Sequence, residues 1–96
     1  MHKVNISLQL LPWSAAKHPY DIVDKAIDII RKSGIKFRVT PFETVMEGDY
    51  DIIMGVIKNI QEECLKYGAD NLLSFVKIQV SRDHDITIED KTGKYD

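Results

Sequence analysis

The sequence has few of the residues on which disulfide, metal and nucleic-acid chemistry depend. Cys64 is the only cysteine among 96 residues, so no disulfide can form within the chain and a cysteine-rich metal site is excluded. Thirteen lysines and arginines face fifteen aspartates and glutamates. The formal net charge of −2 argues against a sequence-independent nucleic-acid binder, because such a protein needs a basic surface.

Long apolar runs are also missing. No run approaches the roughly twenty apolar residues that span a bilayer, so we expect no membrane partner. Met1-His2-Lys3 leads into alternating apolar and polar residues rather than the apolar block of a signal peptide, and we therefore expect a cytoplasmic protein. We expect residues 1–96 to form a single domain with a small core, for which oligomerisation is a common way to bury more surface.

Hydrophobic periodicity predicts four strands and two helices. Alternating apolar and polar residues predict strands at 4–11, 35–42, 44–47 and 72–81. Apolar residues at three- and four-residue spacing predict helices over about 19–33 and 50–66, which end at Gly34 and Gly68. Pro41 favours an edge position for the second strand. A further short strand-like run occupies residues 86–88.

The order β-α-β-β-α-β is typical of a ferredoxin-like split fold. This fold is an α+β sandwich in which a four-stranded antiparallel sheet carries two helices on one face. We expect one phase of the first strand to face the helices and the other phase to lie on an open face with polar neighbours: Asn5, Ser7, Gln9, Arg38, Thr40, Phe75, Lys77 and Gln79. Such a face is either a solvated or dimer-forming surface, or a small polar pocket completed by a second subunit.

Residues 44–50 (TVMEGDY) connect the third strand to the second helix. Gly48 is expected to make the turn and Asp49 to cap the helix. Glu47 lies where the strand stops, so its side chain can reach a ligand instead of entering the core.

Other functions that this fold hosts lack their residues here. An RNA-recognition module needs stacking aromatic residues on its central strands, and a copper chaperone needs paired cysteines. The adjacent residues Asp83, His84 and Asp85 are poorly spaced to converge on one metal ion. Ser7 has no nucleophile–base pattern around it. We therefore predict no catalytic residues and no metal site, while a regulatory amino-acid-binding domain remains compatible with the sequence.

The segment FRVTPFETVMEGDY, residues 37–50, resembles the signature of the small thiamine-binding, YkoF-like family. That signature is an aromatic-rich strand, a proline, a threonine, an apolar pair, Glu-Gly-Asp/Glu and an aromatic residue. Further similarities follow in the right order along nearly the whole chain: Ile6-Ser7 with Pro12, Ser33-Gly34, Gly68, Val76-Lys77-Ile78 and Ile88-Glu89-Asp90-Lys91. The first loop and the segment after Gly68 depart from the family pattern.

The resemblance implies a ferredoxin-like subunit that assembles through its sheet into dimers or tetramers. It also implies binding of thiamine, or of its hydroxymethylpyrimidine part, without catalysis. Carried over by position, four residues of this chain match the polar positions of the family: Ser7, Thr44, Glu47 and Lys77.

The chemistry of thiamine is consistent with these residues. The Glu47 carboxylate can accept from the exocyclic amine or partly neutralise the thiazolium, and Trp13 can stack on a ring. Lys77 is unfavourable beside a cation, so we expect it to pair with Glu47 or Asp49, or to contact a second subunit. The candidate ligand-binding residues are therefore Ser7, Gln9, Trp13, Thr44, Glu47 and Lys77. The alternative is a structural or regulatory oligomeric module that holds no vitamin.

Overall fold

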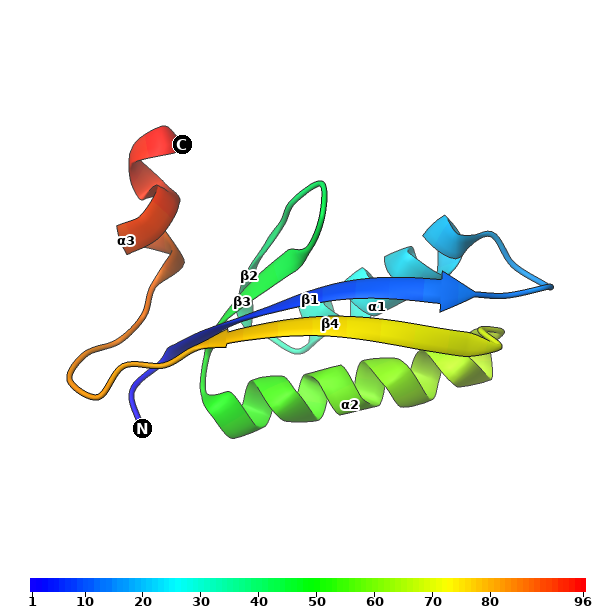
Figure 1. Cartoon of the computed structure of the whole chain (residues 1–96), viewed down its shortest axis with the longest axis horizontal. Coiled ribbons are helices and arrows are strands. Elements are labelled where there is room, and N and C mark those ends of the chain that lie inside the picture. Colours follow the sequence, from blue (N-terminus) through cyan, green and yellow to red (C-terminus); the bar gives the residue numbers. More distant parts are fainter.

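The computed structural model describes all 96 residues as a four-stranded sheet with helices packed on it (Figure 1). The elements are β1 (Val4–Trp13), α1 (Pro19–Lys32), β2 (Lys36–Val39), β3 (Thr44–Gly48), α2 (Tyr50–Tyr67), β4 (Asn71–Gln79), α3 (Ile88–Thr92) and the 3-10 turn η1 (Gly93–Tyr95). The strands are antiparallel in the order β2-β3-β1-β4. This order confirms the predicted ferredoxin-like α+β fold.

The core lies between one face of the sheet and the two long helices. Alternate residues of β1 face the helices, and Ile6 is completely buried beside Met46 of β3. The apolar stripes of α1 and α2 pack against them through Ile22, Ala26, Ile30, Ile53, Ile57, Ile60 and Cys64. Cys64 is fully buried, and burial raises the pKa of its thiol, as befits a small core residue rather than a reactive one.

The predicted signals at the two ends of α2 are confirmed. The Asp49 carboxylate accepts a hydrogen bond from the backbone N–H of Ile52 at 3.0 Å, which caps the first turn. Gly68 ends the helix at a φ of 127°, a conformation that residues with a Cβ rarely adopt. The turn from β3 into α2 is therefore explained by Gly48 and Asp49 alone.

Three strands end two or more residues from the predicted position: β1, β2 and β4, of which β4 ends at Gln79 instead of Ser81. β1 runs through Pro12 to Trp13, because β3 pairs with β1 only as far as Leu8 and Pro12 then has β4 as its single neighbour. β2 is shorter and ends at Val39, because Thr40 turns the chain: its N–H donates to the Glu43 carbonyl at 2.9 Å. β2 is the edge strand that Pro41 predicted.

The strand-like run predicted at residues 86–88 is wrong. Ile86 donates its N–H to the Lys3 carbonyl, but regular pairing goes no further. Thr87 instead caps α3, since its hydroxyl accepts from the N–H of Asp90 at 3.0 Å. Figure 1 shows α3 beyond the N-terminal end of β1, well separated from α2. None of the helices has the length and apolar character that a membrane crossing requires.

Candidate functional site

Two neighbouring rows of side chains on the open face of the sheet contribute the floor of a cavity. The first row crosses all four strands through Arg38, Val45, Ser7 and Lys77, which all line the cavity. The second row contains Lys36, Glu47, Asn5 and Gln79, of which only Asn5 and Gln79 line it. Residues that pair directly in an antiparallel sheet point to the same face, so the register brings these polar groups together.

α3 borders this part of the sheet, and the space between them is an open cavity of about 330 Å³. Ile88, Lys91 and Thr92 line it from α3, and Thr40 and Glu43 line it from the β2–β3 hairpin. A cavity of this size suits a small-molecule ligand. Of the segment for which a strand was predicted, Ile88 therefore lies in the roof of the site.

Glu47 and Asn5 hold the segment that leads into α3. Glu47 Oε1 accepts from the backbone N–H of Ile88 at 2.7 Å, and Asn5 Nδ2 donates to the Ile86 carbonyl at 3.0 Å. Both side chains are buried, with 8% and 5% of their surface exposed. Lys36 Nζ lies 4.0 Å from the second oxygen of Glu47. The Glu47 carboxylate thus binds the first residue of α3 and attaches this helix to the sheet.

Two further contacts attach the C-terminal segment, residues 85–96, to the sheet. Asp85 accepts from the backbone N–H of Lys3 at 2.8 Å, and this bond, with help from His2, lowers the pKa of the Asp85 carboxyl. Arg38 donates to both carboxylate oxygens of Asp96, which raises the pKa of Arg38 and lowers that of Asp96. Both contacts are at the surface, so the buried Glu47 and Asn5 bonds form the inner part of the attachment.

Two buried polar atoms in the lining have no hydrogen-bond partner: Asn5 Oδ1 and Ser7 Oγ. The Asn5 amide is oriented by its Nδ2, which donates to a carbonyl that can only accept, so Oδ1 is left as a free acceptor. The Ser7 hydroxyl can donate or accept. Nearly all buried polar groups in native proteins are paired, so these two atoms on one face of β1 are available to pair with a polar group that enters the cavity.

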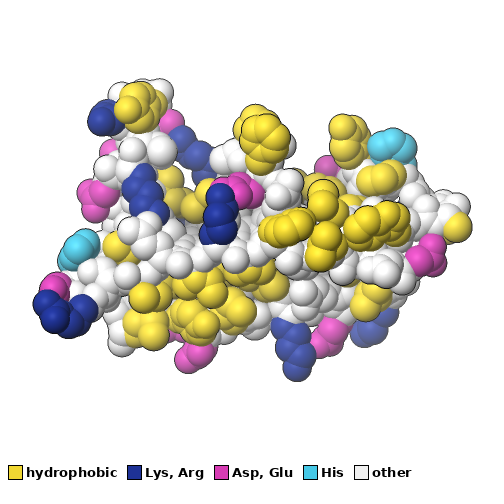
Figure 2. All heavy atoms as spheres, viewed as in Figure 1, with side chains coloured by type: hydrophobic (Ala, Val, Ile, Leu, Met, Phe, Trp, Pro, Cys, Tyr) yellow, Lys and Arg dark blue, Asp and Glu magenta, His cyan; other side chains and the backbone are white.

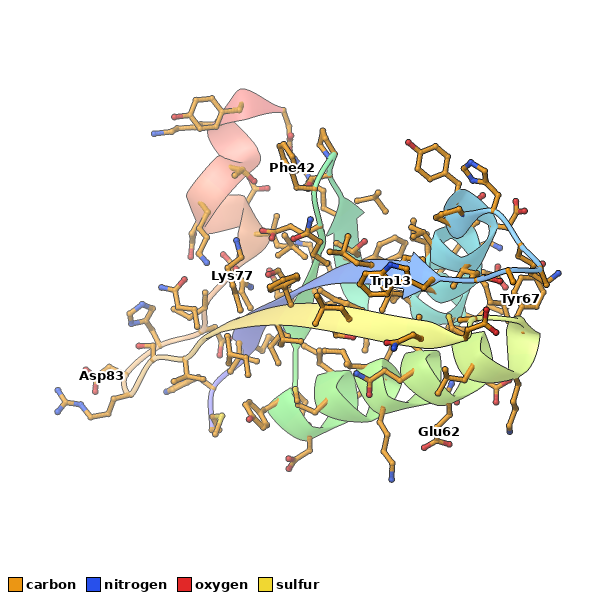
Figure 3. The ribbon with its side chains drawn as sticks, turned by 45° about the vertical axis from the view of Figure 1, so that its right-hand side comes forward. Trp13, Phe42, Glu62, Tyr67, Lys77 and Asp83 are labelled. Carbon is orange, nitrogen blue, oxygen red and sulfur yellow. The ribbon has the colours of Figure 1, made fainter.

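Ser7 and Lys77 are the two predicted site residues that line the cavity. Lys77 is opposite Ser7 in the sheet and lies beside α3, as Figure 3 shows. Its ammonium group pairs with Glu43 Oε1 at 2.8 Å, so the predicted pairing with Glu47 or Asp49 is wrong. The reason is the register: Glu43 comes from the hairpin above the cavity, whereas Glu47 is engaged with Ile88.

The structure does not bring the other predicted residues to this cavity. Thr44 is opposite Leu8 on the helix-covered face, because side chains three positions apart along a strand, such as Thr44 and Glu47, point to opposite faces. Gln9 lies one step beyond Ser7 on the open face, and Trp13 lies at the far end of β1 (Figure 3). The participation of Gln9, Trp13, Thr44 and Glu47 in ligand binding stays a prediction.

Sequence reasoning placed Asn5 on the open face but did not include it among the site residues, and it missed the α3 residues altogether. The signal for α3 was present: Thr87 stands three residues before Asp90, the spacing of a helix N-cap. No local pattern indicates that residues of this helix line a cavity with the open face of the sheet.

Comparison with known proteins identifies the family. A family model described as thiamine-binding protein matches residues 6–96. A UPF0045 protein of Clostridium perfringens (strain 13 / Type A) is 41% identical over 95 residues, which is 99% of each chain. These matches span nearly the whole sequence and are not confined to the segment around Gly48.

Two solved structures share the fold closely. A domain of unknown function, DUF77, from Bacillus cereus has a TM-score of 0.93 and 33% identity, covering 99% of this chain and 91% of that one. A Thermotoga maritima protein provisionally assigned to thiamine biosynthesis or salvage has a TM-score of 0.88 and 29% identity, covering 98% and 99%. The resemblance predicted from the sequence is confirmed, and the chain belongs to the thiamine-binding protein family.

Proposed function

We propose that this chain binds thiamine, or its hydroxymethylpyrimidine part, in the cavity between the open sheet face and α3, and that it catalyses no reaction there. One observation carries the proposal: Asn5 Oδ1 and Ser7 Oγ are buried and unpaired in the lining of one cavity, in a member of the thiamine-binding protein family. Binding without catalysis rests on the description of that family.

The aminopyrimidine ring complements the two unpaired atoms. Its exocyclic amine is a donor that Asn5 Oδ1 can accept, and its neighbouring ring nitrogen is an acceptor to which the Ser7 hydroxyl can donate. Val45 and Ile88 supply apolar contacts to the flat ring from the floor and the roof. The ligand would thus satisfy both buried groups, each of which costs roughly 1–3 kcal/mol when unpaired.

We also propose that residues 1–96 act as one domain that assembles through its open face into dimers or tetramers in the cytoplasm. Support comes from apolar side chains that continue the open face beyond the cavity and are between 38% and 54% exposed: Leu11, Trp13, Leu73 and Phe75. The same apolar patch favours the second candidate function, an oligomeric structural or regulatory module without a vitamin ligand.

Calorimetric titration with thiamine and with hydroxymethylpyrimidine separates the two candidates. We expect saturable binding of at least one of these compounds to the full chain. Circular dichroism on the same sample establishes that the protein is folded. A folded protein that gives no heat with either compound overturns the binding proposal and leaves the oligomeric module.

A further inference from the structure

The cavity is surrounded by cations, although the chain as a whole carries a net charge of −2. Arg38 from β2, Lys77 from β4 and Lys91 from α3 all line it. Glu43 is the single carboxylate in the lining. The three cations therefore approach one small space from three different elements.

Two of these cations have partners that water can replace. Lys77 pairs with Glu43, but the lysine side chain is 73% exposed. Arg38 pairs with Asp96, and both side chains are more than 40% exposed. Lys91 takes part in none of the ion pairs of the structure. Because exposed ion pairs contribute little, an incoming anion can compete for all three cations.

This charge arrangement is unfavourable for a thiazolium cation and favourable for a phosphate. A thiazolium would find only Glu43 in the lining, already 2.8 Å from Lys77. A phosphate would find an unpaired lysine together with two more cations, which are the groups that proteins use to bind phosphate. The phosphate would lie toward the exposed lysines, where its loss of hydration is small, while the neutral amine lies on the buried Asn5 and Ser7.

Resting on the proposed function, we infer that the preferred ligand is a phosphate monoester that carries the aminopyrimidine ring. The ring lies on Asn5 and Ser7, and the ester phosphate lies among Lys91, Lys77 and Arg38. This deepens the proposed function, because it assigns the ligand class from the charge of the cavity.

Four titrations test the inference: hydroxymethylpyrimidine, its monophosphate, thiamine and thiamine monophosphate. We expect each phosphorylated compound to bind at least 10-fold more tightly than its unphosphorylated counterpart at low ionic strength. The difference in affinity between each phosphorylated compound and its counterpart should decrease as salt is added, because the cations are exposed. The pyrimidine monophosphate should show the larger total affinity, since it lacks the thiazolium charge.

Substitution of Lys91 locates the phosphate. Lys91→Gln should reduce the gain from phosphorylation several-fold and leave the affinity for unphosphorylated hydroxymethylpyrimidine unchanged. The matched control is Lys58→Gln, on the outer surface of α2, where the side chain is 79% exposed and outside the cavity lining. This control should leave all four affinities unchanged.

The outcomes are distinguishable. Equal affinity for phosphorylated and unphosphorylated compounds overturns this inference and leaves the proposed function intact. The inference is also overturned if phosphorylated compounds still bind more tightly, by the same factor, to both the Lys91→Gln and the Lys77→Gln protein. The phosphate would then lie elsewhere. Absence of binding by all four compounds defeats the proposed function itself.

Discussion

Asn5 and Ser7 illustrate how single polar residues inside a buried strand acquire a role. Both are more than 90% buried in the N-terminal half of β1, where neighbouring strands satisfy the backbone but not the side chains. Asn5 uses its amide nitrogen to hold Ile86 and keeps its oxygen unpaired. Ser7 has no partner at all. An unpaired buried group destabilises the ligand-free protein, so these two residues favour any ligand that pairs with them.

At this scale we predict opposite effects for two serine substitutions. Ser7→Ala should raise the free energy of unfolding of the ligand-free protein by about 1 kcal/mol, because it removes a buried unpaired hydroxyl, yet it should weaken ligand binding about 2- to 10-fold. Ser14→Ala should lower the free energy of unfolding by about 1 kcal/mol without changing affinity, because the Ser14 hydroxyl donates to the Gly68 carbonyl at 2.7 Å. Urea unfolding and calorimetry measure both quantities.

A Ser7→Ala protein that loses as much stability as Ser14→Ala, and keeps its affinity, would contradict the proposed role. Ser7 would then be a structural residue of the sheet, and its hydroxyl would have a partner when the protein is in solution.

α3 is an element that depends on its attachments. A five-residue helix cannot be stable alone, because forming the first helical turn is unfavourable. Its start is held by the bond from Ile88 to Glu47, and the segment after it is held by the pair between Arg38 and Asp96. Since α3 supplies the roof of the cavity, these attachments determine whether the site is closed.

We predict that Glu47→Ala loosens the C-terminal segment without unfolding the sheet. A hydrogen bond to a charged group contributes about 1.5–3 kcal/mol, so amide exchange in residues 86–92 should become roughly 10- to 100-fold faster. Hydrogen–deuterium exchange detected by mass spectrometry measures this directly. Glu43→Ala is the matched control, because Glu43 pairs with Lys77 and makes no bond to the C-terminal segment.

Unchanged exchange in the Glu47→Ala protein would show that the other attachments of the C-terminal segment hold α3 without Glu47. Faster exchange throughout β1 and β3 would instead show that the carboxylate supports the whole sheet, which the specific attachment model excludes.

At the scale of the whole molecule, β4 is an edge strand with apolar side chains exposed on both of its faces. Phe75 is 51% exposed on the open face, and Ile78, which pairs with Ile6 in the opposite strand phase, is 42% exposed. Figure 2 shows the hydrophobic side chains gathered on both sides of this strand. An unpaired edge with flanking apolar surface is a ready interface for a second chain.

We predict that the wild-type chain self-associates at micromolar concentration and that Phe75→Lys shifts it toward monomer. A lysine in the apolar patch would place an unpaired charge inside the interface, which is costly. Tyr20→Lys, at the start of α1 and 73% exposed, is the matched aromatic control and should leave assembly unchanged. Light scattering over a range of concentrations measures the molar mass. A strictly monomeric wild-type chain would contradict assembly through the sheet.

Local sequence patterns were sufficient to predict most of the helices and strands. The alternation along β1, the apolar spacing in α1 and α2, and the stop at Gly68 each depend on residues within a few positions of one another, so they can be recognised without knowing the tertiary structure. Two residues of the site, Ser7 and Lys77, could be predicted in the same way, because they belong to strand phases that the alternation assigns to the open face.

The sequence by itself determined the β-α-β-β-α-β order, the face of each residue in β1 and, through its resemblance, the family. Only the tertiary structure decided that α3 lines the cavity, that Glu47 holds Ile88 and that Lys77 pairs with Glu43. The physical reason is distance along the chain: Glu47 and Ile88 are 41 residues apart, and their contact depends on how strands align and where a distant segment packs. Neither the alignment of the strands nor the packing of a distant segment is encoded in the periodicity of neighbouring residues.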